Sequence, residues 1–391
     1  MEMMEVHIGL NTVDRAVLTP IVRSALGKET IEVDHWRCQR LKMGTGPMTE
    51  GVYRFEGMAH DKGKHIGWSV VLKVVALPGD AMFEEVAHPL YWKREVLAFQ
   101  SGLLNDLPGE LEVVRCLGIE ERAAGVYWLW LEDARDRFGQ QWPLAQYARA
   151  ARALGVFNGA YLTSRSIPDY AWLVRSGSPR GLINYNTQAL DAIRDLRTWE
   201  HPLVQAAFPV SLKERLVRLW DGREALFDAI ERMPQTLSHL DAWRGNLFSP
   251  QGQDGRLRLV AIDWAYLGWA AVGTDIGDLF APSFGLFGVQ LENPAAFDKV
   301  IFENYMKGLQ ETGWQGDRRL VRFTFAAFAA LKYGCLTLGL VDVAKGGKHP
   351  LVEHFAGHSL EEYLDRLAVL LPYLLDLGDE AHGLLSSLKY V

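Results

Sequence analysis

The amino-acid sequence predicts an α+β fold in which a β-rich N-terminal lobe precedes a mainly helical C-terminal lobe. From about residue 30 to residue 131 the chain consists of short runs rich in β-branched and aromatic residues, with one helical stretch among them. From residue 143 onward, apolar residues recur three and four positions apart, as in amphipathic helices. The two patterns meet at a polar connection near 132–136. We therefore expect one lobe over residues 1–132 and the other over 133–391.

The N-terminal lobe is expected to begin with a helix over about residues 10–26, because its apolar residues recur at helical spacing and Gly27 can end it. A second helix is predicted over about 89–104. Five segments have strand-like composition and together predict an antiparallel five-stranded sheet. They are 31–41, 51–55, 68–76, 111–117 and 125–131.

In the C-terminal lobe, Pro143 is expected to open a helix that reaches about residue 162, since proline favours the first turn of a helix. The last predicted helix, 360–371, should end before Pro372. The apolar stretch 323–341 is interrupted by Lys332 and is short for a membrane span, so a buried helix is expected there. Helical spacing also predicts 212–233, 297–311 and 320–340.

The composition is that of a globular protein with an acidic balance. Hydrophobic residues make up 49% of the chain and charged residues 23%, enough for a large core. The formal net charge of −7 argues against nucleic acid as a partner, which would require a basic surface. The acidic N-terminus lacks the features of a signal peptide, and Cys38, Cys116 and Cys335 are scattered singly. We expect a cytoplasmic protein without membrane association, whose oligomeric state the sequence does not predict.

The segment 238–248, Ser-His-Leu-Asp-Ala-Trp-Arg-Gly-Asn-Leu-Phe, carries the most informative motif of the chain. It has the form H-x-D-x-x-x-x-N, and a strand-like run over 256–262 follows it and leads to Asp263. Kinases that transfer a phosphoryl group place a catalytic base and two magnesium ligands in this order. Asp241 can accept a hydroxyl proton, and Asn246 and Asp263 are hard oxygen ligands suited to Mg²⁺.

The same residues also admit other interpretations. Asp241 and Asn246 are both favoured in turns, and His239 taken alone is better explained as a structural histidine than as a proton-transfer group. A metal-dependent hydrolase would use His239, Asp241 and Asp263 as ligands. That enzyme would require more histidines or aspartates at metal-ligand spacing, and the remaining histidines do not cluster so.

Lys73 lies within the third predicted strand. A lysine in an apolar strand either faces solvent or is held over phosphates by a carboxylate. Glu95, in the helical stretch that follows, is the expected partner, because such an ion pair would direct the ammonium to the α- and β-phosphates of a nucleotide. Glu84 and Glu85 are competing partners.

Two other segments of this lobe are candidates for nucleotide contacts. Gly44 and Gly46 lie in the loop 42–51, where glycines would let backbone amides approach phosphates. The loop does not match the G-x-G-x-x-G spacing, and a plain hairpin turn is the alternative. Glu132 ends the last strand of the lobe, where backbone amide and carbonyl groups could bind an adenine edge.

Aromatic and acidic residues surround the motif in sequence. Four rings could form a cage for a quaternary ammonium group, although such residues more often belong to the core. They are Trp243, Trp264, Tyr266 and Trp269. Asp275 and Asp278 are expected to be structural, either capping the next helix or positioning the motif loops.

Together these residues resemble the aminoglycoside phosphotransferase and choline kinase-like superfamily of small-molecule kinases. The resemblance extends from about residue 31 to 370 and is strongest at 237–264, which is similar to the family's catalytic loop and metal-binding aspartate. Asp278, followed by Leu279, resembles the aspartate that braces these loops. Leu240, however, stands where the family's H-G-D motif commonly has glycine, and Ala-Trp-Arg-Gly at 242–245 replaces the usual Leu-His-x-Gly.

The resemblance implies a protein-kinase-like bilobal fold, Mg²⁺, and ATP or GTP as phosphate donor. It further implies a role for four side chains: Asp241 as base, Asn246 and Asp263 as metal ligands, and Lys73 as phosphate anchor. The expected reaction is phosphorylation of a hydroxyl on an antibiotic, an amino alcohol or a sugar-like metabolite. The alternative is a kinase-like module that binds nucleotide without turnover. Loss of Asp241, Asn246 or Asp263 would favour that module, and all three are present.

Overall fold

The computed structural model describes residues 10–42, 46–175, 180–181, 194–252, 254–334 and 358–388. Contacts divide the chain into two compact units. The first comprises the residues up to Asp106 together with Glu112–Arg135, and the second comprises Leu107–Leu111 together with the residues from Asp136 onward. The assignment of these parts to nucleotide binding and acceptor binding stays a prediction.

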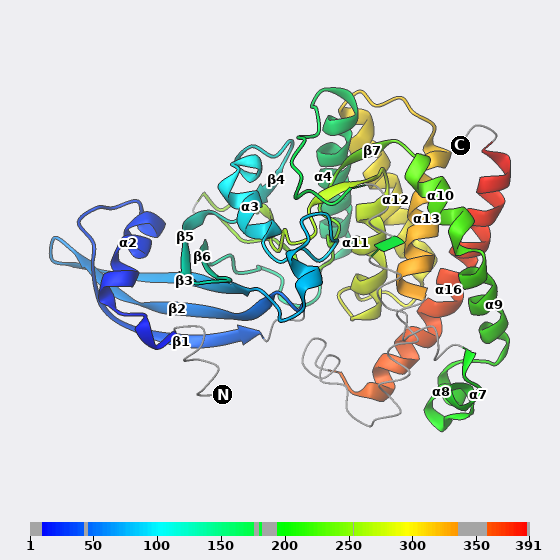
Figure 1. The fold of residues 1–391 in the computed structure, drawn as a ribbon, viewed down its shortest axis with the longest axis horizontal. Helices are drawn as coiled ribbons and strands as arrows, with labels where there is room; N and C mark the ends of the chain where they lie inside the picture. Colours follow the sequence, from blue (N-terminus) through cyan, green and yellow to red (C-terminus); the bar gives the residue numbers. More distant parts are fainter. Residues whose placement is uncertain are drawn as a thin grey trace. The chain divides into compact units, whose positions relative to one another are not determined.

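The first unit is built on an antiparallel five-stranded sheet with the strand order β1-β2-β3-β6-β5 (Figure 1), as the sequence predicts. The predicted strand 111–117 is wrong in its bounds, because residues 111–113 form a strand outside this sheet and the sheet is completed by residues 116–123. Its strands are β1 (Glu32–Lys42), β2 (Thr49–Asp61), β3 (Lys64–Ala76), β5 (Cys116–Ala123) and β6 (Val126–Glu132). Along β3, Val70, Leu72 and Val74 contribute to the core that this sheet forms with helix α2. Since side chains alternate along a strand, Lys73 lies on the opposite face.

Helix α2 (Arg15–Leu26) begins and ends at the residues that favour such positions. Asp14 caps it by accepting a hydrogen bond from Val17 N at 3.0 Å, and Gly27 ends it with a φ of 64°. The helix predicted over 89–104 is shorter, because Gly102 interrupts it with a φ of 75°. The remaining elements of this region are η1 (Leu10–Thr12), η2 (Ala81–Glu84), α3 (Arg94–Gln100), η3 (Leu103–Asn105) and β4 (Leu111–Val113).

The second unit is mainly helical, as predicted. Its described helices are α4 (Leu144–Thr163), α7 (Leu196–Glu200), α8 (Pro202–Ala207), α9 (Ser211–Asp221), α10 (Arg223–Arg232), α11 (Thr274–Gly285), α12 (Pro294–Glu311), α13 (Arg318–Ala329) and α16 (Leu360–Ser387). Figure 1 shows α4 beside α12. The two helices touch at Gly155 and Gly308, where an added Cβ would lie 2.3 Å from Tyr305 O and 2.1 Å from Arg152 O, respectively.

Two short strand pairs interrupt these helices and carry the motif. Strand β7 (Gln235–Ser238) pairs antiparallel with β10 (Gly268–Ala271), and β8 (Leu247–Phe248) pairs antiparallel with β9 (Leu259–Ala261). The loop between β7 and β8 contains the H-x-D-x-x-x-x-N pattern. The loop after β9 contains Asp263, so both predicted metal ligands belong to one local substructure.

Three predicted helix boundaries are wrong. Helix α16 continues through Pro372 to Ser387, because burial of Leu371, Leu374 and Leu375 outweighs the roughly 3 kcal/mol cost of an interior proline. Residues 212–233 form two helices separated at Gly222. Helix α13 ends at Ala329 and a π-helical turn, η4 (Ala330–Gly334), follows it, whereas 335–340 lie outside the described residues.

The predictions on membrane association and on the cysteines can be compared with the structure. In the part of the chain that the structure describes, no helix has the length and apolar character needed to cross a membrane. Cys38 and Cys116 are both exposed, and Cys335 lies outside the described residues.

Candidate active site

The predicted base, Asp241, follows a left-handed turn at the end of β7. Leu240 has a φ of 65°, which non-glycine residues rarely adopt. Asp275, on the first turn of α11, holds this turn by accepting hydrogen bonds from Leu240 N at 2.9 Å and from His239 N at 3.2 Å. The Leu240 side chain is buried in an apolar cluster with Val174. Both the backbone and the side chain before Asp241 are therefore fixed by other elements.

Asp241 and Asn246 are in direct contact. The Asn246 amide Nδ2 donates to Asp241 Oδ2 at 2.7 Å and to the Asp241 backbone carbonyl at 3.0 Å. Because the amide nitrogen is used in this way, the carbonyl oxygen is the atom of the Asn246 side chain that can bind a cation. The five-residue spacing of the motif thus brings the predicted base and one predicted metal ligand together.

The β8–β9 hairpin returns the chain from Asn246 to Asp263. Leu247 pairs with Ala261, and Ile262 N donates to Asn246 O at 2.9 Å. Asp263 then adopts a φ of 62°, a conformation that aspartate tolerates better than most residues. The hairpin explains how two residues that are 17 positions apart in sequence belong to one site.

His239 connects the two loops. Its Nε2 lies 3.0 Å from the Ile262 carbonyl, and its Nδ1 accepts a hydrogen bond from Asp241 N at 3.3 Å. Its ring also packs on Trp264, with the ring centroids 4.4 Å apart. The geometry favours the structural interpretation of His239, with Nε2–H as donor and Nδ1 as acceptor.

The site concentrates negative charge. Burial of the Asp241 carboxyl raises its pKa to about 8. The Lys332 ammonium opposes this shift, whereas the negative charges of Asp278 and Asp263 add to it. Burial likewise raises the pKa of Asp275 to about 6, opposed by the hydrogen bonds that it accepts. A divalent cation would be attracted to such a cluster.

Asp278 does not brace the motif loops, contrary to the expectation from resemblance; Asp275 does so. Asp278 is fully buried and pairs with Lys332 of η4, with Nζ and Oδ1 2.5 Å apart. The Tyr333 hydroxyl donates to the same oxygen. Single π-helical turns are frequent at functional sites, and this one brings a lysine and a tyrosine to the acidic cluster.

The predicted metal ligands have suitable chemistry for Mg²⁺. Over the described ranges, no group of three or more His, Cys, Asp or Glu side chains is arranged as a metal site. Magnesium in phosphoryl-transfer sites is instead bound by one or two protein oxygens together with substrate phosphates and water. Asn246 and Asp263, next to Asp241, fit that requirement.

In the first unit, Lys73 and Glu95 form a buried ion pair. Nζ and Oε2 are 2.5 Å apart, and the side chains are 8% and 3% exposed. Because the pair is buried, Lys73 is not on a solvated face, which removes the simplest alternative for this lysine. Its contact with phosphates stays a prediction.

The other predicted nucleotide contacts are placed as follows. Glu132 ends β6, and its carboxylate pairs with Arg115, whose Nε lies 3.4 Å away. Gly46 lies in the turn before β2, where an added Cβ would meet no atom within 4 Å. Gly44 lies outside the described residues. A role for any of the three in binding nucleotide stays a prediction.

The aromatic residues near the motif do not share one environment. Trp264 is fully buried against Phe157 and His239 and belongs to the core. Trp269 is half-buried, and the Arg175 guanidinium lies 5.2 Å from its ring centroid. An arginine over this ring occupies a face that a quaternary ammonium ligand would need.

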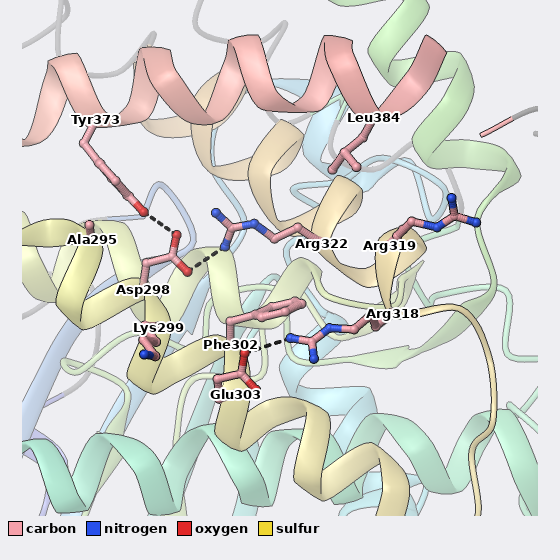
Figure 2. A pocket seen from close by; sticks show the side chains of 10 residues that line it. All are labelled: Ala295, Asp298, Lys299, Phe302, Glu303, Arg318, Arg319, Arg322, Tyr373 and Leu384. Carbon is pink, nitrogen blue, oxygen red and sulfur yellow. Dashed lines mark hydrogen bonds and ion pairs between the residues drawn. The ribbon is translucent and has the colours of Figure 1, made fainter. Parts of the chain in front are cut away.

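A pocket of about 420 Å³ lies elsewhere in the second unit, among α12, α13 and α16 (Figure 2). Figure 2 shows the Arg322 side chain directed at Asp298, with Nη1 and Oδ1 2.6 Å apart, and Arg318 directed at Glu303. The charges in this pocket are thus largely paired with one another. None of the predicted site residues lines it.

Sequence reasoning missed Asn158, the residue that joins Asp275 to the strands. Its buried side chain donates to Asp275 Oδ2 at 3.0 Å and to Leu237 O at 2.9 Å. It accepts a hydrogen bond from the Tyr305 hydroxyl at 2.8 Å. An asparagine in the otherwise apolar stretch 154–161 was the available signal. Lys332 gave the same kind of signal, since it interrupts the apolar stretch 323–341, but nothing in the sequence linked it to Asp241, 91 residues away.

In its fold, the chain is similar to solved structures of small-molecule kinases. The chain is similar to an amicoumacin kinase solved with AMP-PNP and Ca²⁺, with a TM-score of 0.51 and 13% identity over 89% of this chain and 90% of that one. It is also similar to a choline kinase from Cryptosporidium parvum Iowa II, with a TM-score of 0.50 and 12% identity over 96% and 99% of the two chains. The expected resemblance is confirmed at the level of the fold.

A microcompartment-associated aminopropanol kinase also matches, with a TM-score of 0.47 and 14% identity over 96% of this chain and 98% of that one. No protein-family profile matches the sequence, and no curated protein matches it significantly.

Proposed function

We propose that this protein is a small-molecule kinase that transfers the γ-phosphate of ATP or GTP to a hydroxyl group of an antibiotic, an amino alcohol or a sugar-like metabolite. The observation that carries the proposal is the contact between Asp241 and Asn246, beside Asp263. It supplies a proton acceptor and two cation ligands in one place. The kinase-like fold supports the same assignment.

In the proposed reaction, the acceptor hydroxyl oxygen attacks the γ-phosphorus. The new O–P bond forms as the bond to the β–γ bridging oxygen breaks, and the nucleoside diphosphate leaves. Asp241 accepts the hydroxyl proton. Because Asn246 Nδ2–H already donates to Asp241 Oδ2, the hydrogen bond orients the carboxylate and leaves Oδ1 to receive the proton.

The remaining roles concern the nucleotide. Asn246 and Asp263 would bind Mg²⁺, which neutralises phosphate charge when bound. Lys73, oriented by Glu95 at 2.5 Å, would contact the α- and β-phosphates. The backbone near Glu132 would contact the base, and the loop with Gly44 and Gly46 would approach the phosphates.

The proposed partners are therefore a nucleotide and a small hydroxylated molecule, without nucleic acid or membrane. The net charge of −7 supports the exclusion of nucleic acid. The proposed location is the cytoplasm, supported by the scattered single cysteines.

The test is a screen for ADP or GDP formation over a panel of hydroxylated compounds, with Mg²⁺ and either nucleotide. Each compound is run with the parent protein and with Asp241→Asn. Diphosphate release that depends on one compound class, and that is lost in the variant, is the expected result. Mg-nucleotide binding without turnover on any compound would instead favour the non-catalytic module.

A further inference from the structure

We propose that Arg244 is a positioning residue for Asn246. Arg244 attaches the turn that contains Asn246 to Asp136 and Trp142. This attachment sets the affinity for the metal–nucleotide complex. The inference rests on the proposed function. It assigns a role to Arg244, which stands at the unspecified position of the family's Leu-His-x-Gly pattern.

Arg244 holds the turn from within. Its Nη1 donates to the Leu247 carbonyl at 2.8 Å, immediately after Asn246. The turn is closed by hydrogen bonds from Asn246 N and Leu247 N to Trp243 O, at 2.9 and 3.1 Å. The backbone N of Arg244 donates to Ser283 Oγ on α11 at 3.2 Å. The turn is thus attached to the same helix that bears Asp275.

The Arg244 guanidinium also reaches the segment that begins the second unit. Its Nη2 lies 3.2 Å from Asp136 Oδ1, and the two side chains are 9% and 6% exposed. The same Nη2 donates to the Gly139 carbonyl. The guanidinium carbon lies 4.5 Å from the centroid of the Trp142 ring. One planar cation therefore joins three backbone or side-chain groups at fixed angles.

Asp136 extends the connection to Ser249, the residue that follows β8. Its carboxylate accepts from Ser249 N at 2.6 Å and from Trp142 Nε1 at 3.1 Å. It also accepts from Phe138 N at 2.7 Å. Residues on both sides of Asn246, at 244 and 249, are consequently bound to one buried carboxylate. Displacement of this carboxylate or of Arg244 would release the turn at two points.

The burial of this arginine is unfavourable for stability alone. The guanidinium is buried, and its Nε has no hydrogen-bond partner among the described residues. A buried ion pair is commonly no more stabilising than apolar residues of similar volume. A functional role for the fixed turn explains why an imperfectly satisfied cation occupies this position. Groups that orient metal ligands typically change metal affinity by roughly 10- to 100-fold when they are removed.

The experiment compares Arg244→Met and Arg244→Lys with the parent. Arg322→Met is the matched control, because Arg322 is also paired with a buried aspartate, Asp298, at 2.6 Å and lies over an aromatic ring, that of Phe302, among α12, α13 and α16 and away from the motif. The readouts are the Mg²⁺ concentration for half-maximal turnover, the affinity for Mg–AMP-PNP by calorimetry, and Tm.

We expect Arg244→Met to raise the half-maximal Mg²⁺ concentration and weaken Mg–AMP-PNP binding by at least tenfold, while Arg322→Met changes neither. Arg244→Lys should recover part of the loss, since it keeps the charge without the planar fork. If Arg244→Met does not fold, Asp136→Asn, which keeps the side-chain volume, should shift the same quantities several-fold.

Unchanged metal dependence in a folded Arg244 variant, or in Asp136→Asn, would overturn the inference while leaving the kinase assignment intact. A parent protein that shows neither Mg–AMP-PNP binding nor turnover would overturn the proposed function, and this inference with it. Mg–AMP-PNP binding and turnover of the parent protein distinguish the two failures, because the parent is inactive only if the proposed function is wrong.

Discussion

The Asp275 carboxylate accepts a hydrogen bond from Leu240 N at 2.9 Å, and Leu240 is held there at a φ of 65°. A leucine in the left-handed region costs roughly 1–2 kcal/mol. The cost is offset by the second hydrogen bond of Asp275, from His239 N, and by burial of the leucine side chain with Val174. The strained residue directly precedes the proposed base, so its backbone conformation sets the direction in which the Asp241 side chain points.

This relationship predicts that a glycine variant at position 240 has a higher free energy of unfolding than an alanine variant. Leu240→Ala should lose the buried side chain and keep the strain, and we expect a loss of about 2–5 kcal/mol. Leu240→Gly loses the same packing but is free of strain, so it should be about 1 kcal/mol more stable than the alanine variant. Urea unfolding of the three proteins measures the order. An alanine variant that is more stable than the glycine variant would show that the left-handed conformation is not maintained.

The acidic cluster predicts a pH dependence of stability. Asp241 has its pKa raised to about 8 in the folded protein, so the folded state retains a proton that the unfolded chain releases. The associated stability is complete below the unfolded pKa near 4 and is lost as the pH rises to about 8. Asp275, with a pKa of about 6, contributes mainly below pH 6.

Burial also raises the pKa of Asp278, and the Asp34 carboxylate raises that of His60, so Asp241 is isolated by comparing the parent with Asp241→Asn between pH 6 and pH 8. In the absence of divalent metal, the parent should lose up to ~1.4 kcal/mol of unfolding free energy per pH unit in this window, and Asp241→Asn should lose much less. Unfolding curves with a chelator at pH 6, 7 and 8 provide the measurement. Parallel pH profiles for the two proteins would mean that the Asp241 carboxyl is ionised throughout.

The Lys73–Glu95 pair predicts separable effects on stability and turnover. Lys73→Met should raise the nucleotide KM, lower kcat, and destabilise the fold by roughly 3–5 kcal/mol, because it leaves Glu95 buried without its partner. Adding Glu95→Gln should restore much of the stability without restoring turnover. Kinetics and Tm on the same preparations test this. Recovery of both quantities in the double variant would assign the pair to stability alone.

The sequence was sufficient for the parts of the fold and site that depend on short-range patterns. The β-rich composition of 68–76 placed Lys73 in a strand, and the H-x-D-x-x-x-x-N motif assigned Asp241 and Asn246 to one site, where the structure shows them in contact.

Other features depend on packing between distant segments and could not be predicted. Similarity favoured Asp278 as the loop brace, whereas Asp275, one helical turn earlier, meets the loop. Pro372 suggested a helix end, but the leucine-rich face of α16 is buried on both sides of it. The conformation of Leu240 had no signal beyond the missing glycine, because φ is fixed by contacts with α11.

The most direct test of the account is turnover by Asp241→Asn. The substitution keeps the side-chain volume, and the account predicts a folded protein that binds Mg-nucleotide at near-parent affinity while kcat falls by on the order of 10²- to 10⁴-fold. The measurement is single-turnover phosphoryl transfer to the best acceptor from the compound screen, with Mg-nucleotide affinity determined on the same preparation. Near-parent turnover in the variant would contradict the assignment of Asp241 as the base and, with it, the central claim.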